Sequence, residues 1–177
     1  AIRARARSSW ASAATTGSPS ARASVCALAA WRSAPRTSPR SVKARAHTRR
    51  DTIVKIFGSY HGHHDYVMVS IGVPYHRIGI RDSYESLPYG GGIPQSVADL
   101  TIPVPFNDAG AMERRIERLF DEGRPPACVI MEPAMMNLGV VLPEPGYLEA
   151  VRELTRRHDV LLIFDEVKTG LCIAAGG

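Results

Sequence analysis

A short histidine-rich stretch is the first part of the sequence whose residue types could do chemistry. Residues 60–65 read YHGHHD, so three histidines and one aspartate fall within six positions. The H-x-H-x-D spacing of His61, His63 and Asp65 is typical of metal ligands, because imidazole and carboxylate groups bind Zn²⁺. Taken alone, the stretch favours a metal-dependent hydrolase. A hydrolase pattern of this type requires a histidine directly after the aspartate, however, and residue 66 is a tyrosine.

Strands and helices alternate over the part of the chain that would have to position such residues. Segments 106–123 and 144–158 have apolar residues at helical spacing, and Asn107 or Asp108 can cap the first of them. The apolar runs that read as strands are Thr52–Phe57, Ala127–Glu132 and Val160–Val167. Because parallel strands need crossover connections, this order predicts an α/β fold with a mainly parallel sheet and crossover helices.

Polar residues follow each of the three apolar runs. Tyr60 and His61 come after the first run, residues 132–137 after the second, and Asp165 closes the third. In parallel α/β sheets, ligands bind beyond the carboxyl ends of the strands. We therefore expect these three polar clusters to meet in one site.

The composition excludes several classes of protein. The chain has 177 residues, 45% of them hydrophobic, which is enough for one domain with a real core. Its three cysteines are far apart and odd in number, so neither a disulfide framework nor a zinc knuckle is expected. No apolar run approaches the roughly 18 residues that cross a bilayer, so we expect no membrane partner.

The first fifty residues differ from the rest of the chain. They hold 11 of the 22 Lys and Arg residues and none of the 17 Asp and Glu residues. Their mixture of Arg, Ala, Ser and Pro has no sustained periodicity, so disorder is expected. Three interpretations are open: a basic nucleic-acid arm, an organellar transit peptide, and a segment read outside the native frame, which we favour. We therefore expect a basic segment over residues 1–47 and a partial transferase domain over residues 48–177.

From about residue 45 onward, the sequence resembles the class III, fold-type I aminotransferases, which use pyridoxal phosphate. Within them it is most similar to glutamate-1-semialdehyde aminomutase and its relatives. The segments that carry the resemblance are, in order, IVKIFGSYHGHHD, PFND, VIMEPAMMNLGVVLPEPGYLEAVRELTRRHDVLLIFDEVKTG and AAGG. The resemblance implies part of the large domain of a fold-type I transferase, pyridoxal 5'-phosphate as cofactor, and a parent that is an aminotransferase or aminomutase.

The resemblance also implies roles for individual residues. Asp165 corresponds to the aspartate that keeps the pyridine nitrogen of the coenzyme protonated. Val167 and Tyr60 correspond to the residues that pack on the two faces of the ring. Asn137 matches an asparagine near the phenolic oxygen of the coenzyme, and Glu132 matches a glutamate beside the site.

Other residues of the same segments receive smaller roles. His61 is expected to line the pocket, and Gly62 permits a tight backbone turn after Tyr60. Lys168 is expected to be a solvated side chain. No catalytic residue and no metal ligand is assigned.

Two elements of the family pattern are missing from the sequence. A Ser-Gly-Thr-Glu-Ala loop for the coenzyme phosphate is expected near residues 33–41, where the chain reads SAPRTSPRS. DNA that encodes this stretch can encode Gly-Thr-Glu in another frame, which is why we favour a frameshift. The catalytic lysine of the family lies after the FDEV segment, and none of Lys43, Lys55 and Lys168 has its context. We therefore expect the isolated chain to be inactive.

The expected partners follow from the resemblance. They are a small-molecule amino-acid or amine substrate and, for the full-length parent, a second copy in a homodimer; no nucleic acid is expected. The cytoplasm is the expected location, with an organelle as the alternative if the first fifty residues are a transit peptide. The alternative functions are a metal-dependent hydrolase that uses the H-x-H-x-D stretch and a non-catalytic fragment.

Overall fold

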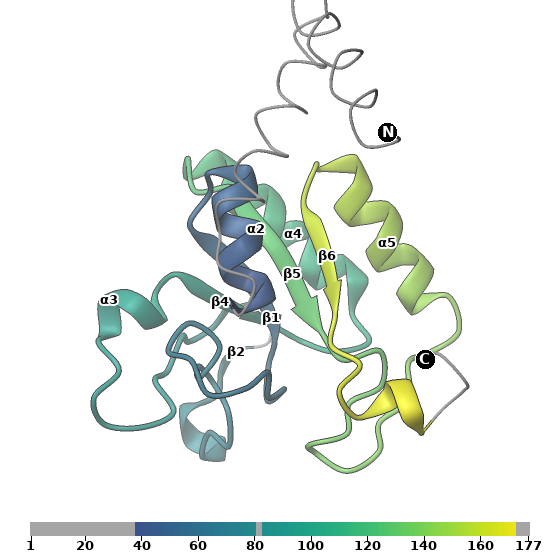
Figure 1. Cartoon of the computed structure of the whole chain (residues 1–177), viewed down its shortest axis with the longest axis horizontal. Helices are drawn as coiled ribbons and strands as arrows, with labels where there is room; N and C mark the ends of the chain where they lie inside the picture. The colour runs from purple at the N-terminus through teal and green to yellow at the C-terminus, as the bar shows by residue number, and fades with distance from the viewer. Residues whose placement is uncertain (1–37, 81–82, 173–177) are drawn as a thin grey trace, which may run out of the picture.

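A four-stranded parallel sheet forms the centre of the fold (Figure 1). A computed structural model describes residues 38–80 and 83–172. The strands are β1 (Thr52–Ile56), β4 (Thr101–Val104), β5 (Pro126–Met131) and β6 (Leu161–Phe164). They lie in the order β4-β1-β5-β6, and every neighbouring pair is parallel. The predicted α/β fold with a mainly parallel sheet is confirmed.

Strand β4 is an element that the sequence did not reveal. It contains Pro103, which pairs in register with Lys55 of β1. Proline has no N–H to donate to a sheet and is therefore confined to edge strands and bulges. Within the described residues β4 lies at the edge of the sheet. One side of the strand therefore has no partner strand there, and Pro103 is tolerated although it interrupts the strand pattern in the sequence.

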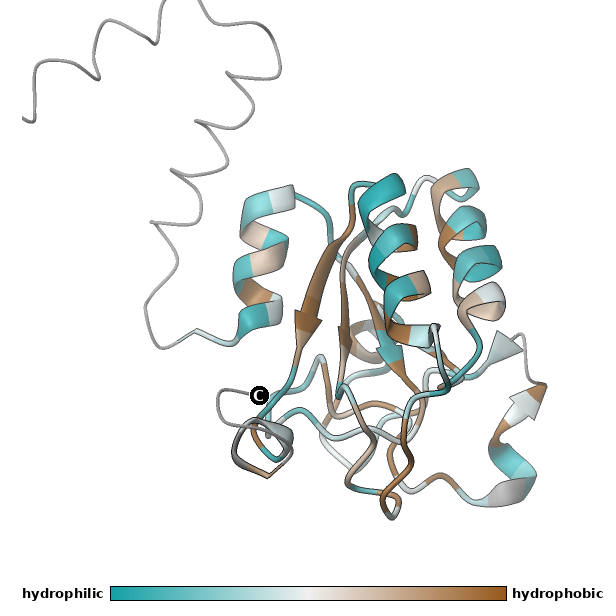
Figure 2. Cartoon of the chain, turned by 90° about the vertical axis from the view of Figure 1, so that its right-hand side faces the viewer, coloured by the Kyte–Doolittle hydropathy of each residue, from teal (hydrophilic) through white to brown (hydrophobic). Residues whose placement is uncertain are grey.

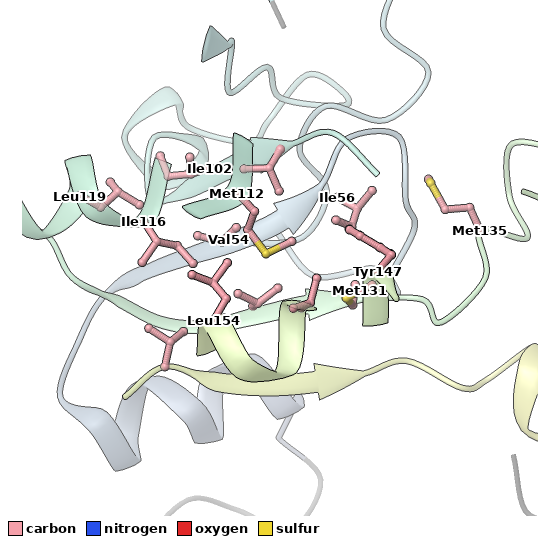
Figure 3. Close-up of a cluster of buried hydrophobic side chains, with 14 residues drawn as sticks. Val54, Ile56, Ile102, Met112, Ile116, Leu119, Met131, Met135, Tyr147 and Leu154 are labelled. Carbon is pink, nitrogen blue, oxygen red and sulfur yellow. The ribbon is translucent and has the colours of Figure 1, made fainter. Parts of the chain in front are cut away.

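Helices α4 (Ala109–Asp121) and α5 (Tyr147–Arg157) cover one face of the sheet. Asp108 caps α4, because its side chain accepts a hydrogen bond from the Ala111 N–H at 2.9 Å. Asp108 is one of the two residues predicted as the cap. Apolar side chains of both helices pack against alternate residues of β1, β4 and β5 in one core cluster (Figure 3). Full burial of an Ile or Leu side chain such as Ile116 or Leu119 contributes about 1.5–3 kcal/mol.

Helix α2 (Arg40–Thr48) covers the opposite face of the sheet. Figure 2 shows the apolar strands between the helices on either side. Ala44 is 1% exposed and packs with Ile53, Cys128 and Ile130. The helix begins inside segment 1–47, for which we expected disorder or an out-of-frame origin; residues 1–37 of that segment lie outside the described residues. The described folded unit therefore starts before residue 48, whereas the origin of the segment stays a prediction.

The remaining elements are short and lie mainly between β1 and β4. They are η1 (Tyr75–Arg77), β2 (Gly79–Ile80), β3 (Ser83–Tyr84), α3 (Gln95–Ala98) and, after β6, η2 (Thr169–Leu171). Strands β2 and β3 form a separate antiparallel pair. In the part of the chain that the structure describes, no helix has the length and apolarity that crossing a membrane requires.

Candidate functional site

The carboxyl ends of β1, β5 and β6 meet at one cavity of about 220 Å³. Its lining residues are Tyr60, His61, Gly62, Glu132, Asp165, Val167 and Lys168. The predicted convergence of the three strand-end clusters is therefore present in the structure. A second cavity, of about 510 Å³, lies between the β3 region and the arginines Arg115 and Arg124, and it includes none of these residues.

Asp165 leaves β6 and forms a direct hydrogen bond to His61, which follows β1. The Asp165 Oδ2 atom lies 2.8 Å from His61 Nδ1, and the other oxygen, Oδ1, accepts a hydrogen bond from the Val167 N–H at 3.1 Å. The His61 hydrogen bond is the main reason why the pKa of Asp165 lies below its usual value, although partial burial acts in the opposite direction. The carboxylate is thus held ionised and in one orientation.

His61 is itself fixed by a buried serine. Its Nε2 atom lies 2.9 Å from Ser59 Oγ, and the side chain of His61 is completely buried. A serine, a histidine and an aspartate in this order are also the parts of a nucleophilic triad. Ser59 is 0% exposed, however, and its hydroxyl donates to the Ile56 carbonyl at 2.7 Å. It does not line the cavity, so its role is to orient His61 and not to attack a substrate.

The residues at the mouth of the cavity are more exposed. Tyr60 is 38% exposed, with its hydroxyl 3.2 Å from His63 Nδ1, and Val167 is 88% exposed. Gly62 has φ +93°, a conformation that glycine adopts at little cost and that lets the chain turn after His61. An aromatic and an aliphatic side chain therefore lie at the opening of the cavity, and the buried His61 and the partly buried Asp165 lie further in.

Glu132 follows β5 and lines the inner part of the cavity. It is 4% exposed, and its Oε2 atom accepts a hydrogen bond from the Met136 N–H at 3.0 Å. Its other oxygen, Oε1, is buried and has no hydrogen-bond partner among the described residues. A buried carboxylate oxygen without a partner is costly, so a ligand that supplies a donor would be stabilised there.

Asn137 lies next to the cavity without lining it. It is exposed, and its Oδ1 atom accepts a hydrogen bond from Lys168 Nζ at 2.5 Å. Lys168 is exposed, as expected, but it lines the cavity and its ammonium group has this defined partner. Of the six residues predicted for the coenzyme site, five line one cavity and Asn137 is connected to it through Lys168.

Comparison with known proteins identifies the family. The family description "Aminotransferase class-III" matches residues 14–177. The chain belongs to the class-III aminotransferases.

Individual class-III relatives match the folded part of the chain. A glutamate-1-semialdehyde 2,1-aminomutase of Syntrophus aciditrophicus is 46% identical over 134 residues, which are 76% of this chain and 29% of that protein. The chain therefore spans less than a third of the length of this relative.

Solved structures of a transaminase and an aminomutase are also similar to this chain. An omega-transaminase from Sphaerobacter thermophilus matches 71% of this chain and 28% of its own, with 41% identity and a TM-score of 0.63. A variant of the glutamate-1-semialdehyde-aminomutase from Pseudomonas aeruginosa PAO1, in complex with PMP, matches 71% of this chain and 25% of its own, with 34% identity and a TM-score of 0.56. The described sheet is thus part of the larger fold of PLP-dependent transferases.

The metal-hydrolase alternative finds no support in this class-III chain. His61 is bonded to Asp165 and Ser59, and His63 is paired with the Tyr60 hydroxyl. Among the described residues, the His, Cys, Asp and Glu side chains that come close enough together to share an ion do not include His61, His63 or Asp65. Of the histidine-rich stretch, Tyr60, His61 and Gly62 line the cavity.

Lys55 is a buried charged residue of β1 for which the sequence analysis predicts no role at the site. Its side chain is 0% exposed in the middle of β1, and burial lowers its pKa from 10.5 to about 7, although Glu132 acts in the opposite direction. A signal was present, because a lysine inside the β-branched run TIVKIF stands where a parallel strand is buried on both faces.

Proposed function

We propose that the cavity binds the pyridine ring of pyridoxal 5'-phosphate and that the chain is part of an enzyme that transfers an amino group. The observation that carries the proposal is the Asp165 carboxylate, kept ionised and oriented by His61 at the edge of the cavity. A carboxylate at this place can keep the ring nitrogen protonated. When bound, the coenzyme supplies an electron sink for carbanion chemistry at an amino substrate.

The other cavity residues fit the same ring. An apolar cavity of about 150 Å³ is known to admit benzene, so a cavity of about 220 Å³ has room for a substituted pyridine. In the proposal, Tyr60 and Val167 pack on the two faces of the ring and exclude water from it. Glu132 offers an acceptor to a donor group of the bound molecule, and its unpartnered oxygen supports a ligand of this kind.

The contribution of His61 is to keep a hydrogen on Nδ1, which donates a hydrogen bond to the Asp165 carboxylate. Ser59 contacts Nε2 of the imidazole and Asp165 contacts Nδ1, so the two hydrogen bonds together fix the orientation of the ring. This bond lowers the pKa of Asp165 and keeps the carboxylate charged while the ring nitrogen carries its proton. His61 therefore acts through Asp165 and not on the reacting atoms.

The substrate class in the proposal is a small amino-acid or amine molecule, as for the class-III family. The aminomutase branch is supported by the identity to glutamate-1-semialdehyde aminomutases and by the resemblance at Asn137, which we propose lies near the phenolic oxygen of the coenzyme. The bond from Lys168 would then hold the Asn137 amide in place. We also propose that the complete parent is a homodimer, for which the exposed apolar loop 138–142 offers surface.

Isothermal titration of the 177-residue chain with pyridoxal 5'-phosphate tests the proposal. We expect saturable binding to the wild-type chain and binding that is weaker by about tenfold or more in Asp165→Ala. Asp121→Ala removes an exposed aspartate at the end of α4 and is the matched control, which should bind as the wild type does. Absence of binding to the wild type, or equal binding to Asp165→Ala, would contradict the proposed site.

A further inference from the structure

A group of side chains that can bind a metal ion lies where helix α4 meets the end of helix α5. Glu113 and Glu117 are on α4, and His158 follows the last residue of α5. One carboxylate oxygen from each glutamate and one ring nitrogen of His158 all lie within 4.8 Å of one another. None of the three side chains lines the cavity that contains Asp165. The cluster is therefore separate from the proposed coenzyme site.

The geometry of the two helices brings the three residues together. Glu113 and Glu117 are four residues apart, so their side chains are neighbours on one face of α4. His158 ends α5, and β6 begins three residues later at Leu161. The His158 ring also packs against α4, because its centroid lies 5.8 Å from that of the Phe120 ring. The imidazole is thus held beside the two glutamates by residues from both helices.

The His158 ring has a nitrogen whose hydrogen-bonding capacity is not satisfied. Its Nε2 atom is buried and has no hydrogen-bond partner among the described residues. Most buried polar atoms in proteins have such a partner, so the burial of this nitrogen is costly unless a ligand supplies one. Imidazole nitrogen is the commonest side-chain ligand of metal ions. A metal ion is therefore a partner of suitable chemistry for this ring.

The two glutamates differ in how their charge is balanced. Glu113 Oε1 lies 2.8 Å from Nη2 of Arg157. Glu117 is exposed, and the described part of the chain gives it neither a hydrogen bond nor an ion pair. Like charges four residues apart on a helix repel each other. A divalent cation between the two carboxylates would remove this repulsion and balance the charge of Glu117.

We propose that Glu113, Glu117 and His158 bind one divalent metal ion of the Zn²⁺ type. Zn²⁺ is bound by imidazole nitrogen and carboxylate oxygen, and a site with three protein ligands leaves a fourth position for water. His158 precedes β6, whereas the cavity lies after the end of that strand. The ion therefore connects α5 to α4 at the end of the sheet opposite to the cavity, and its binding does not depend on the coenzyme.

Titration calorimetry of the 177-residue chain with Zn²⁺ tests the site. We expect one saturable site in the wild type and an affinity weaker by about tenfold or more in both His158→Gln and Glu117→Gln. Loss of even an outer partner of a metal ligand weakens binding by about 10- to 100-fold. Arg157→Gln removes the cation that competes for Glu113 and should strengthen binding by about two- to fivefold, the effect of an exposed ion pair.

Two control variants separate this site from other groups that can bind zinc. His63→Gln alters the H-x-H-x-D stretch, and Glu149→Gln removes an exposed carboxylate on α5. Both should bind Zn²⁺ as the wild type does.

Thermal unfolding provides a second readout. An ion that binds the folded chain raises the unfolding midpoint, so Zn²⁺ should raise that of the wild type more than that of Glu117→Gln. If His158→Gln does not fold, Glu117→Gln decides the proposal, because it changes an exposed side chain.

Two results would overturn the proposal. One is a wild-type chain that binds no Zn²⁺. The other is an affinity for Zn²⁺ that is the same in the wild type, in His158→Gln and in Glu117→Gln, which would show that the ion binds elsewhere on the chain.

Discussion

Two carboxylates line the same cavity, and they differ in how the protein holds them. Asp165 follows β6, is partly exposed, and has a hydrogen-bond partner for each oxygen, one of them the His61 ring. Glu132 follows β5, is nearly fully buried, and has a backbone partner for one oxygen only. Its charge acts on the buried Lys55 of β1.

This difference indicates that the two acids have different roles in the cavity. A carboxylate that is fixed at both oxygens and kept ionised by a histidine provides a constant charge, which suits a permanent partner such as a protonated ring nitrogen. A carboxylate with a free buried oxygen provides an acceptor that is satisfied only when a donor arrives. The same cavity thus combines an electrostatic anchor with a hydrogen-bonding position.

The largest expected effect is the difference in coenzyme binding between the amide variants of the two acids. Asp165→Asn should weaken the binding of pyridoxal 5'-phosphate by about 10- to 100-fold, because a hydrogen bond to a charged group contributes about 1.5–3 kcal/mol. Glu132→Gln should weaken coenzyme binding by only about fivefold, because the amide keeps an acceptor oxygen and a neutral hydrogen bond contributes about 1 kcal/mol. Titrations followed by coenzyme absorbance measure both values, and equal losses would remove the distinction between the two acids.

The next effect concerns Lys55 and the stability of the fold. Unfolded lysine keeps its proton up to about pH 10.5, whereas folded Lys55 loses it near pH 7. Between these values the unfolded chain binds more protons, so the stability of the wild type rises with pH. Methionine does not titrate. The free energy of unfolding of the wild type, relative to that of Lys55→Met, should therefore increase by up to about 1.4 kcal/mol per pH unit over this range.

Urea unfolding at several pH values measures this gain. Leu119→Met, a substitution of a buried apolar residue in the core, is the control and should show no pH-dependent difference from the wild type. A difference between wild type and Lys55→Met that stays constant from pH 7 to pH 10 would show that Lys55 does not lose its proton in the folded state.

A smaller effect is expected for the partner of Asp165. His61→Gln removes the hydrogen bond that chiefly lowers the Asp165 pKa, so that pKa should rise towards its ordinary value. The carboxylate would then be lost at a higher pH on acidification, and coenzyme binding should fall off at a higher pH than in the wild type. Binding measured from pH 2 to pH 6, a range that includes the ordinary pKa of 3.8 and lower values, tests this, with His76→Gln, an exposed residue of η1, as control; coincident profiles would contradict it.

The smallest effect is expected at the exposed mouth of the cavity. Tyr60→Phe removes the bond to His63 but keeps the ring, so coenzyme binding should change by about twofold or less. Tyr60→Ala removes the ring as well and should weaken binding more strongly. Should the two variants lose the same amount, the contribution of Tyr60 would come from its hydroxyl group and not from ring packing.

Much of the fold could be predicted because its elements carry strong periodic patterns. Strands β1, β5 and β6 are apolar runs, and α4 and α5 have clear apolar faces. Strand β4 was missed because Pro103 interrupts a run of only four residues. Helix α2 was missed because its sequence is rich in Arg and Ala, and its stability comes from packing against the sheet, which no local pattern reveals.

The site was predictable in outline and not in its contacts. The alternation of strands and helices predicted that His61 and Asp165 lie at the same edge of the sheet, but the bond between them joins residues 104 positions apart, and only the packed sheet brings those atoms to 2.8 Å. Lys55 was visible as a charge in an apolar run, yet its burial depends on β4, β5 and the Val69 segment together. Such roles follow from tertiary neighbours and not from spacing.

The central claim is that Asp165 recognises the protonated ring nitrogen of the coenzyme. The most direct test compares pyridoxal 5'-phosphate with its 1-deaza analogue, in which carbon replaces that nitrogen, on the wild-type chain and on Asp165→Ala. We expect the wild type to prefer the natural coenzyme by about tenfold or more, the value of a charge-assisted hydrogen bond, and Asp165→Ala to lose this preference. A preference that is the same in both proteins, or absent from the wild type, would contradict the claim.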